Sequence, residues 1–255
     1  MKKSSALVIL SGGQDSTTCL FWAKEWFDEV HAVTFNYGQR HKLELLAAEK
    51  VAAMAGVVSH EIVNFPDILR STSPLTAKGA ELETYVDHEE MEKVIGDRVE
   101  LTFVPMRNSL FFVVAMNRAV ALGVNHLVTG ICQEDNANYP DCTEVFRSAF
   151  ETMANTSLGT LDDERKYTLY APLMNLSKPE TVRLARNLPG CWDALAYTHT
   201  NYDGTYPPVS KDHANVLRAW GFERAGFPDP LVMRAHQEGL MPLPTTSNYD
   251  SVRNG

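Results

Sequence analysis

The chain has 255 residues, of which 44% are hydrophobic and 22% are charged, and its net charge is −9 at pH 7. These proportions are ordinary for a soluble globular protein, and the length allows one α/β domain or a domain with an appended lobe. The negative charge argues against binding to long nucleic acid, which depends on many phosphate contacts, but it permits a local basic pocket.

Composition also indicates the compartment. No stretch approaches the roughly 20 apolar residues that span a bilayer, and the first residues lack the sections of a secretory signal peptide. We therefore expect a cytoplasmic protein without membrane contact. The four cysteines are far apart and form no C-x-x-C pair, which is typical of neither a disulfide framework nor a zinc knuckle. We expect free thiols at Cys19, Cys132, Cys142 and Cys191.

The first informative segment is residues 11–16 (SGGQDS), which follows an apolar run over residues 6–10. An apolar run bounded by glycines predicts a buried strand of a parallel sheet, and residues 17–26 are predicted as a helix. Two glycines let backbone N–H groups approach a phosphate, and the helix N-terminus favours an anion. Asp15 is suited to orienting the loop or to holding Mg²⁺ between phosphates.

A plain glycine turn is the alternative for this segment, but the complete six-residue string favours a nucleotide site. The lysine and the spacing of the kinase and GTPase phosphate loop are both missing. The string resembles the SGGxDS loop of the N-type ATP pyrophosphatases, or PP-loop enzymes, which adenylate a substrate and release pyrophosphate. The resemblance implies that ATP is bound by Val8, Leu10, Ser11, Gly12, Gly13, Gln14, Asp15, Ser16 and Thr17.

Strand-like and helix-like segments alternate along most of the remaining chain. We predict further strands over residues 31–35, 59–63 and 126–130, and helices over 43–54, 109–122, 143–154 and 178–188. Such alternation predicts an α/β fold in which helices flank both faces of a parallel sheet. Ligands of such sheets bind at the carboxyl ends of the strands.

Two regions depart from this alternation. Residues 70–98 are polar and include an acidic stretch, and we interpret them as a mobile excursion with a solvated face. From residue 191 onward the chain is aromatic, rich in proline and poor in strand patterns. We predict an ATP-binding domain over residues 1–190 and a small C-terminal lobe, packed on it, over residues 191–255.

Three further strings lie beside predicted strand ends or helix starts, where the site of such a sheet is built. They are residues 36–41 (NYGQRH), 102–108 (TFVPMRN) and 130–142 (GICQEDNANYPDC). Arg107 suits a bidentate contact with phosphate or carboxylate, and Lys178 suits a point-charge contact. Arg107 bridging a local carboxylate, Tyr139 filling the core and Lys178 on the surface are the structural alternatives. The joint occurrence of these residues beside the loop favours a site, most of all for Arg107 and Asp141.

These strings closely resemble the 7-cyano-7-deazaguanine synthase family, QueC, above all in residues 37–41 (YGQRH) and 139–142 (YPDC). The resemblance extends from about residue 5 to residue 230. It implies an adenine-nucleotide α-hydrolase-like sheet and a homodimer. Family members activate the carboxylate of 7-carboxy-7-deazaguanine with ATP, let ammonia form the amide, and then dehydrate the amide to the nitrile.

The resemblance, together with the chemistry of the side chains, assigns roles. A carboxylate of aspartate accepts the N1–H and the exocyclic amine of a guanine-like base, and Tyr139 is suited to stack on it. The expected catalytic residues are Asp15, Ser16, Arg107 and Lys178. The expected substrate-binding residues are Tyr37, Gln39, Arg40, Arg107, Asn108, Asp135, Tyr139 and Asp141.

The C-terminal lobe departs from the family pattern, in which most members hold zinc with four cysteines. Those positions here hold Asn201, Val209, Asp212 and Asn215. None is a thiolate, and valine cannot ligate zinc, so we expect ATP and Mg²⁺ but no zinc. Hydrogen bonds among Asn201, Asp212 and Asn215 are the expected replacement. A rebuilt site of His199, Asp212 and His213 is the alternative.

Other departures lie at the predicted pocket, with Met106 where glycine is common and Asn36 where aspartate is usual. Together they indicate a specialised paralogue. The first interpretation is a QueC-like, ATP-dependent C–N ligase that joins 7-carboxy-7-deazaguanine to ammonia. One alternative stops at the amide and conjugates the deazaguanine to a protein or another amine, in an anti-phage or modification operon. Another is a non-catalytic nucleotide-binding scaffold, against which the intact Ser11, Asp15 and Lys178 argue.

Overall fold

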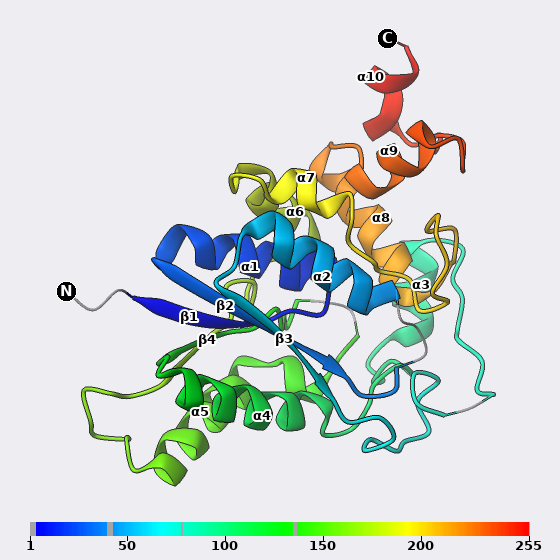
Figure 1. The fold of residues 1–255 in the computed structure, drawn as a ribbon. Helices are drawn as coiled ribbons and strands as arrows, with labels where there is room; N and C mark the ends of the chain where they lie inside the picture. The colour runs from blue at the N-terminus through cyan, green and yellow to red at the C-terminus, as the bar shows by residue number, and fades with distance from the viewer. Residues whose placement is uncertain (1–3, 40–42, 78, 135–136, 255) are drawn as a thin grey trace.

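A five-stranded parallel sheet forms the centre of the fold (Figure 1). The structure is a computed structural model that describes residues 4–39, 43–77, 79–134 and 137–254. Its strands are β1 (Ser5–Ile9), β2 (Glu29–Asn36), β3 (Ser59–Asn64), β4 (His126–Val128) and β5 (Thr168–Tyr170). Their order across the sheet is β3-β2-β1-β4-β5, and every neighbouring pair is parallel. The prediction of an α/β fold with a parallel sheet is confirmed.

Strand β1 is the central strand and contributes to both hydrophobic cores. Ala6 and Val8 belong to one core, and Leu7 belongs to the other. A strand covered on both faces has no solvent side, so its sequence is a continuous apolar run and not a polar–apolar alternation. The apolar run that predicted this strand is therefore a direct result of its position in the sheet.

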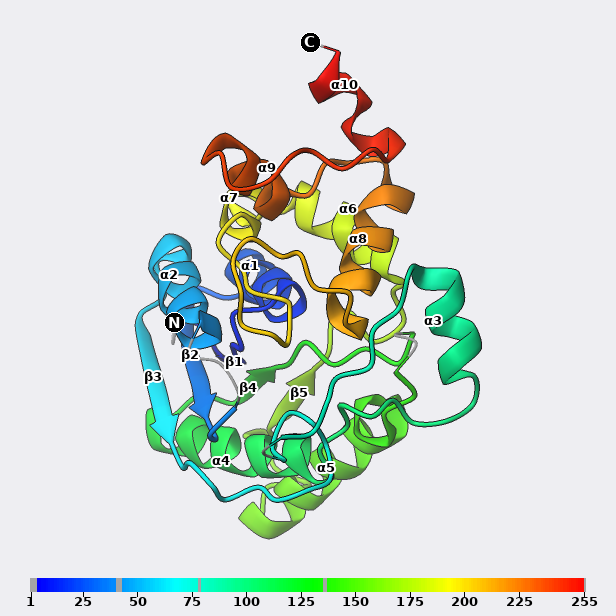
Figure 2. The ribbon, with the colours of Figure 1, turned by 90° about the vertical axis from the view of Figure 1, so that its right-hand side faces the viewer.

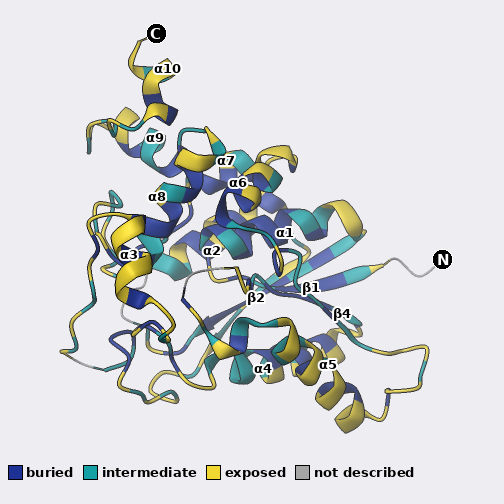
Figure 3. Cartoon of the chain, turned by 180° about the vertical axis from the view of Figure 1, so that it is seen from behind, coloured by how far each residue is buried: buried dark blue, intermediate teal, exposed yellow. Residues whose placement is uncertain are grey.

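Helices cover both faces of the sheet, as Figure 1 shows. One face packs against α1 (Gln14–Trp26) and α2 (Leu43–Ala55). Three further helices pack on these two and on one another and extend the same core, namely α6 (Lys178–Asn187), α7 (Cys191–Leu195) and α8 (His213–Ala225). The other face packs against α4 (Arg107–Leu122) and α5 (Glu144–Leu158). In Figure 3 the strands and the sheet-facing sides of these helices are mostly buried, whereas α5 turns an exposed side outward.

Residues 70–98 hold an ordered helix, α3 (His88–Ile95), where the acidic composition predicted a mobile excursion. Its Met91 and Ile95 are four positions apart and share a buried face, and they pack against Val216 and Leu217 of α8 (Figure 2). The acidic residues of α3 occupy its exposed side, as predicted. Two apolar positions in an acidic stretch are a weak periodic signal, and this is why the helix was missed.

The C-terminal quarter contains α8, α9 (Pro230–Gln237) and α10 (Asp250–Arg253), which extend away from the sheet (Figures 1 and 2). One core cluster joins Leu20 and Leu173 to Ala194 and Phe222. The division at residues 190 and 191 stays a prediction. All four cysteines are free. No helix of the described residues is long and apolar enough to span a bilayer.

Candidate functional site

A cavity of about 580 Å³ lies at the carboxyl ends of β1, β2 and β4, next to the point where the strand order reverses. Ligands of open α/β sheets bind at such reversal points. Most of the residues predicted from the sequence line this cavity. They are Leu10, Ser11, Gly13, Gln14, Asp15, Ser16, Tyr37, Gln39, Arg107, Asn108, Tyr139 and Lys178.

The remaining predicted residues fall into two groups. Val8, Gly12, Thr17 and Asp141 are described but do not line the cavity. Arg40 and Asp135 lie outside the described residues, so their predicted roles in substrate binding stay predictions. Gly12 and Thr17 belong to the same loop and helix start as the lining residues, and Asp141 lies directly behind Asn108.

The glycine of the loop is required by a close backbone approach. Gly12 has a φ of 87°, and a Cβ built there would lie 2.5 Å from the carbonyl oxygen of Glu44 and 2.7 Å from the amide nitrogen of Ala48. Any side chain would have to displace the backbone of α2, which cannot yield as a flexible side chain can. The loop therefore lies directly on the first turns of α2.

Serine hydroxyls and an uncapped helix start shape the inner wall of the loop. The hydroxyls of Ser11 and Ser16 are 2.9 Å apart, and the Ser11 N–H donates to the Ser16 hydroxyl at 3.1 Å. Helix α1 begins at Gln14, and its N-cap residue Gly13 offers no side-chain acceptor. The first N–H groups of α1 thus meet the cavity with the positive end of the helix dipole, an arrangement that favours a phosphate.

Asp15 and Lys178 form an ion pair across the cavity. The Lys178 ammonium lies 2.8 Å and 3.0 Å from the two carboxylate oxygens of Asp15. Lys178 is only 7% exposed. Its stem packs on Gly221 of α8, where a Cβ would lie 2.5 Å from the Lys178 Cγ. Lys178 begins α6 just after the capping box of Ser177 and Glu180, so its position is fixed at both ends. The surface-lysine alternative is excluded by this burial.

A second cation, Arg107, begins α4 on the opposite wall. Its guanidinium acts electrostatically on the Glu44 carboxylate, and the hydroxyls of Tyr37 and Tyr139 face it. Burial raises the pKa of Glu44 to about 7, although Arg107 opposes that shift. Gln39 closes the turn after β2, because its side chain accepts from the Tyr37 N–H at 3.0 Å. The two cations and the helix start make the cavity suitable for an anion.

Tyr139, Asn108 and Asp141 build one end of the cavity. The Tyr139 hydroxyl is bonded to Thr102 and Glu100, and burial raises its pKa well above the ordinary value. Asn108 donates through its side chain to the Asp141 carbonyl oxygen at 3.2 Å, and its backbone N–H approaches the Asp141 carboxylate at 3.4 Å. Burial raises the pKa of Asp141, while Arg107 lowers it. Asp141 therefore supports Asn108 from behind the cavity wall.

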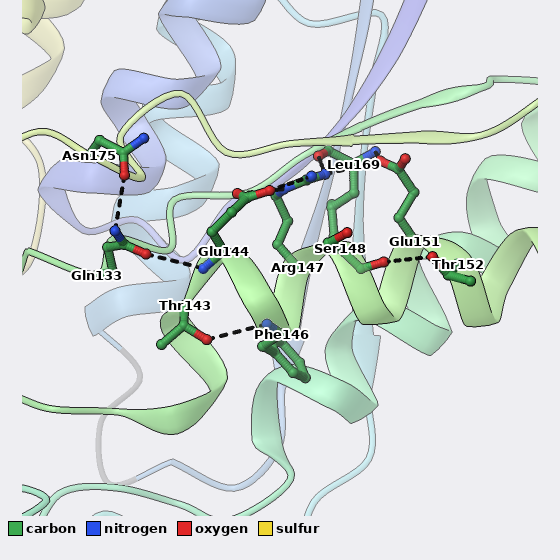
Figure 4. A network of polar contacts seen from close by, with 10 residues as sticks. All are labelled: Gln133, Thr143, Glu144, Phe146, Arg147, Ser148, Glu151, Thr152, Leu169 and Asn175. Atoms are coloured by element: carbon green, nitrogen blue, oxygen red, sulfur yellow. Dashed lines mark hydrogen bonds and ion pairs between the residues drawn. The ribbon is translucent and has the colours of Figure 1, made fainter.

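The loop after β4 is tied to its neighbours through Gln133, which also lines the cavity (Figure 4). Its amide donates to the Asn175 side chain at 3.0 Å, and its carbonyl oxygen accepts from the Glu144 N–H at 3.2 Å. Thr143 caps α5 in the same place by accepting from the Phe146 N–H at 3.2 Å. One side chain thus joins the loops after β4 and β5 to the start of α5.

The last wall comes from the segment between α7 and α8, which contributes His199, Thr200 and Tyr202. The His199 N–H donates to the Gly12 carbonyl oxygen at 2.9 Å, so this segment is bonded to the N-terminal loop by its backbone. Arg218 of α8, 1% exposed, holds Thr200 at 2.7 Å and Asp229 at 2.6 Å.

Asp212 is the centre of a hydrogen-bond network in the region where the sequence analysis considered zinc. Its carboxylate accepts from the Tyr202 N–H at 2.9 Å, the Ser210 hydroxyl at 2.6 Å and the Asn215 N–H at 3.0 Å. The expected link between Asp212 and Asn215 is present, whereas Asn201 bonds to Thr205. Among the described residues, no three His, Cys, Asp or Glu side chains gather as metal ligands.

Comparison with known proteins gives the family. The model of "Queuosine biosynthesis protein QueC" matches residues 5–226. The 7-cyano-7-deazaguanine synthase of Laribacter hongkongensis is 44% identical over 90% of this chain and 94% of its own length. The chain belongs to the QueC family. Another QueC family relative, the 7-cyano-7-deazaguanine synthase of Gloeobacter violaceus, is 44% identical over 91% of this chain and 96% of its own length.

Among solved structures, this QueC family chain is similar to a predicted subunit of tRNA methyltransferase from Methanocaldococcus jannaschii. The TM-score is 0.45 and the identity 16%, over 95% of this chain and 94% of that chain.

Several lining residues of this QueC family member were not singled out by the sequence analysis as site residues. Glu44 is in the first turn of α2, only a few positions beyond the string at residues 36–41, and that proximity was the available signal. Tyr202 and His213 come from the lobe, and His213 was considered in the sequence analysis only as a ligand of the alternative metal site. His213 reaches the cavity because α8 packs on α6. Spacing in the sequence carries no information on that contact.

Proposed function

We propose that this chain is an ATP-dependent C–N ligase that adenylates 7-carboxy-7-deazaguanine and joins the activated carboxylate to ammonia, giving the amide and then 7-cyano-7-deazaguanine. The observation that carries the proposal is the Asp15–Lys178 ion pair beside the start of α1, in a cavity shared with Arg107. The names of the QueC relatives supply the product, and the family resemblance of the sequence supplies the substrate.

The first step makes a poor electrophile reactive. A carboxylate oxygen attacks the α-phosphorus of ATP, an O–P bond forms, and pyrophosphate leaves. Charge develops on the α-phosphate oxygens, and preorganised donors stabilise it better than water does. Ser11, Ser16 and the first N–H groups of α1 supply donors, and Lys178 supplies positive charge. Arg107, on the opposite wall, is placed to hold the substrate carboxylate.

Mg²⁺ would arrive with ATP, and the donor set suits it. Asp15 offers carboxylate oxygens, the ligands that Mg²⁺ prefers, and its side chain is still 28% exposed at the cavity. Held there, the ion would supply positive charge that neutralises the leaving pyrophosphate. The deazaguanine ring would be bound at the other end of the cavity, by the face of Tyr139 and the side chain of Asn108.

In the second step the amine nitrogen attacks the acyl carbon, a C–N bond forms, and AMP leaves with the electron pair of the broken C–O bond. Repeating the activation on the amide oxygen and removing that oxygen gives the nitrile. Following the family resemblance, we place the reaction in the cytoplasm and in a homodimer, without long nucleic acid and without zinc. Light scattering on the purified protein tests the dimer.

Two measurements test this function. Exchange of labelled pyrophosphate into ATP that depends on 7-carboxy-7-deazaguanine reports adenylation alone. Mass spectrometry of a reaction with ATP, Mg²⁺ and ammonium then identifies the product, and the nitrile mass is the expected result. An amide without nitrile, or a deazaguanine mass added to a protein in a parallel reaction, would replace the product while keeping the activation step. Absence of substrate-dependent exchange would contradict the ligase function.

A further inference from the structure

Two carboxylates line the cavity among the described residues, and only one of them is engaged. They belong to Asp15 and Glu44. Asp15 receives both of its hydrogen bonds from Lys178. Within the described part of the chain, the Glu44 carboxylate takes part in no hydrogen bond or ion pair, and its contact with Arg107 is electrostatic. With respect to the described residues, the Glu44 carboxylate thus has its acceptor positions open toward the cavity.

The backbone fixes Glu44 against the nucleotide loop. Its carbonyl oxygen closes the space beside Gly12, where a Cβ would lie at 2.5 Å. The side chain is half-buried and shares the cavity wall with Tyr37 and Arg107. Glu44 thus lies beside the loop proposed to hold the phosphates and interacts electrostatically with Arg107, proposed to hold the substrate carboxylate, so we place its side chain in the region between these two sites. That region is where an acyl-adenylate would be attacked.

The proposed reaction needs a proton acceptor at this place. Ammonia exists in neutral solution almost entirely as ammonium, which has no lone pair with which to attack. A base whose pKa lies near the working pH is the most effective acceptor, because it is both ionised and sufficiently basic. Neither Lys178 nor Arg107 can accept this proton, because both side chains are already protonated cations. Their role is to stabilise negative charge.

We propose that Glu44 is the general base that deprotonates the incoming ammonium during amide formation. The inference rests on the proposed function. The N–H bond of ammonium breaks, its proton moves to a Glu44 carboxylate oxygen, and the freed electron pair forms the C–N bond. AMP leaves with the pair of the C–O bond, and the second proton lost by nitrogen passes to solvent.

Other candidate bases of the cavity are less suitable. Burial, Lys178 and His88 lower the pKa of His213 to about 4, so its ring is a weak base. The Nε2 of His199 lies 2.8 Å from the Asn201 carbonyl oxygen, which engages it. The pKa of Glu44 is shifted upward, whereas that of His213 is shifted downward. Burial raises the pKa of Glu44 to about 7, and Arg107 opposes the rise. Burial raises the pKa of the neighbouring Tyr37 most, Arg107 lowers it, and Glu44 in turn helps to raise it.

The test separates activation from amine transfer. The variant Glu44→Gln keeps the size of the side chain and removes its basicity. Glu49→Gln, on an exposed position of the same helix, is the matched control. Each protein is assayed for substrate-dependent pyrophosphate exchange, then for transfer to ammonium and to hydroxylamine at pH 7. Hydroxylamine is largely uncharged at this pH and needs no base before it attacks.

We expect Glu44→Gln to keep exchange within about threefold, to lose transfer to ammonium by about 100-fold, and to keep transfer to hydroxylamine, since general bases contribute 10²–10⁴-fold. Raising the pH should restore its ammonium reaction in proportion to free ammonia. Unchanged ammonium transfer, or equal loss with both amines, would overturn the assignment. So would loss of exchange in both Glu44→Gln and Glu44→Asp. Absence of exchange in the unaltered protein would overturn the proposed function itself.

Discussion

Two regions of the cavity wall, the loop at residues 11–16 and the segment at residues 199–215, are joined by one backbone hydrogen bond from His199 to Gly12. They are held in shape by different means. The loop is fixed by backbone conformation, because Gly12 lies where no side chain fits. The segment is fixed by side chains around Asp212. A backbone requirement leaves a recognisable string in the sequence, whereas a side-chain network leaves almost none.

The difference also concerns energy. A structural zinc ion contributes about 10–16 kcal/mol to the folding of a small motif. An intramolecular hydrogen bond contributes about 1 kcal/mol, and a buried donor left without its acceptor costs about 1–3 kcal/mol. The three bonds to Asp212 therefore hold the segment more weakly than a metal ion would, and each depends on the same carboxylate.

The largest expected effect lies on the loop side. Lys178→Met removes the partner of Asp15 and the buried positive charge beside α1, and the loss of one preorganised donor costs about 10²–10³-fold in rate. We expect substrate-dependent pyrophosphate exchange to fall by at least about 100-fold. Lys166→Met, at an exposed position, is the control. Normal exchange by Lys178→Met would show that the ion pair only maintains the fold.

On the segment side, Asp212→Ala should act mainly on stability. It leaves the N–H groups of Tyr202 and Asn215 and the Ser210 hydroxyl without their acceptor. We expect the free energy of unfolding to fall by about 3 kcal/mol, at about 1 kcal/mol for each bond, as measured in urea. The exposed Asp203→Ala should change it by less than about 0.5 kcal/mol. If both variants were equally stable, the network would not hold the segment.

The ionised side chain of Glu44, a residue that lies beside the loop at Gly12, should reduce the stability of the fold in a pH-dependent manner. Burial raises its pKa in the folded protein to about 7 from the ordinary value of 4.5. The folded state thus binds the proton more tightly, and this contribution is present below pH 4.5 and lost as the pH rises to about 7. We expect Glu44→Gln to exceed the unaltered protein in unfolding free energy by roughly 1–3 kcal/mol at pH 8. This difference in unfolding free energy should vanish near pH 4. A difference that stayed constant between pH 4 and pH 8 would show that burial does not raise the pKa of Glu44.

Met106 offers a smaller test of the backbone argument. It has a φ of 65°, and its side chain is 68% exposed and does not line the cavity. The left-handed conformation costs about 1–2 kcal/mol for a residue with a Cβ. Glycine avoids that cost, but its greater conformational freedom in the unfolded state reduces the stability of the folded protein by about 0.5–1 kcal/mol. Met106→Gly should therefore stabilise the protein by about 0.5 kcal/mol. Thermal unfolding would show this as a small rise in Tm, and a fall would point to a contact of the methionine side chain.

The smallest effect, none at all, is expected from a metal chelator on the segment. The network around Asp212 and Asn201 consists of protein groups. Incubation with a strong zinc chelator should leave the urea midpoint and the fluorescence of the folded protein unchanged. A lowered midpoint that added zinc restores would show that the lobe does bind this metal.

The architecture could be predicted from the sequence because burial on both faces makes the central strand β1 an apolar run directly before the glycine loop, and because strand-like and helix-like segments alternate after it. Short elements were harder to predict. Strand β5 has only three residues, and the apolar spacing of Met91 and Ile95 is obscured by glutamates. At the site, strings that begin helices predicted Asp15, Arg107 and Lys178, which the structure places around one cavity. Which face of α2 meets the cavity depends on packing, so Glu44 was missed.

The hydrogen bond between His199 and Gly12 also bears on how the protein is made. The partners of the N-terminal loop come late in synthesis, since Lys178 follows Asp15 by 163 positions and His199 comes later still. Contacts between distant positions form slowly, and a nascent chain folds from its N-terminus. The early sheet strands therefore exist on the ribosome with one wall of the cavity absent. A chain released before residue 199 would carry the loop without the segment that closes it.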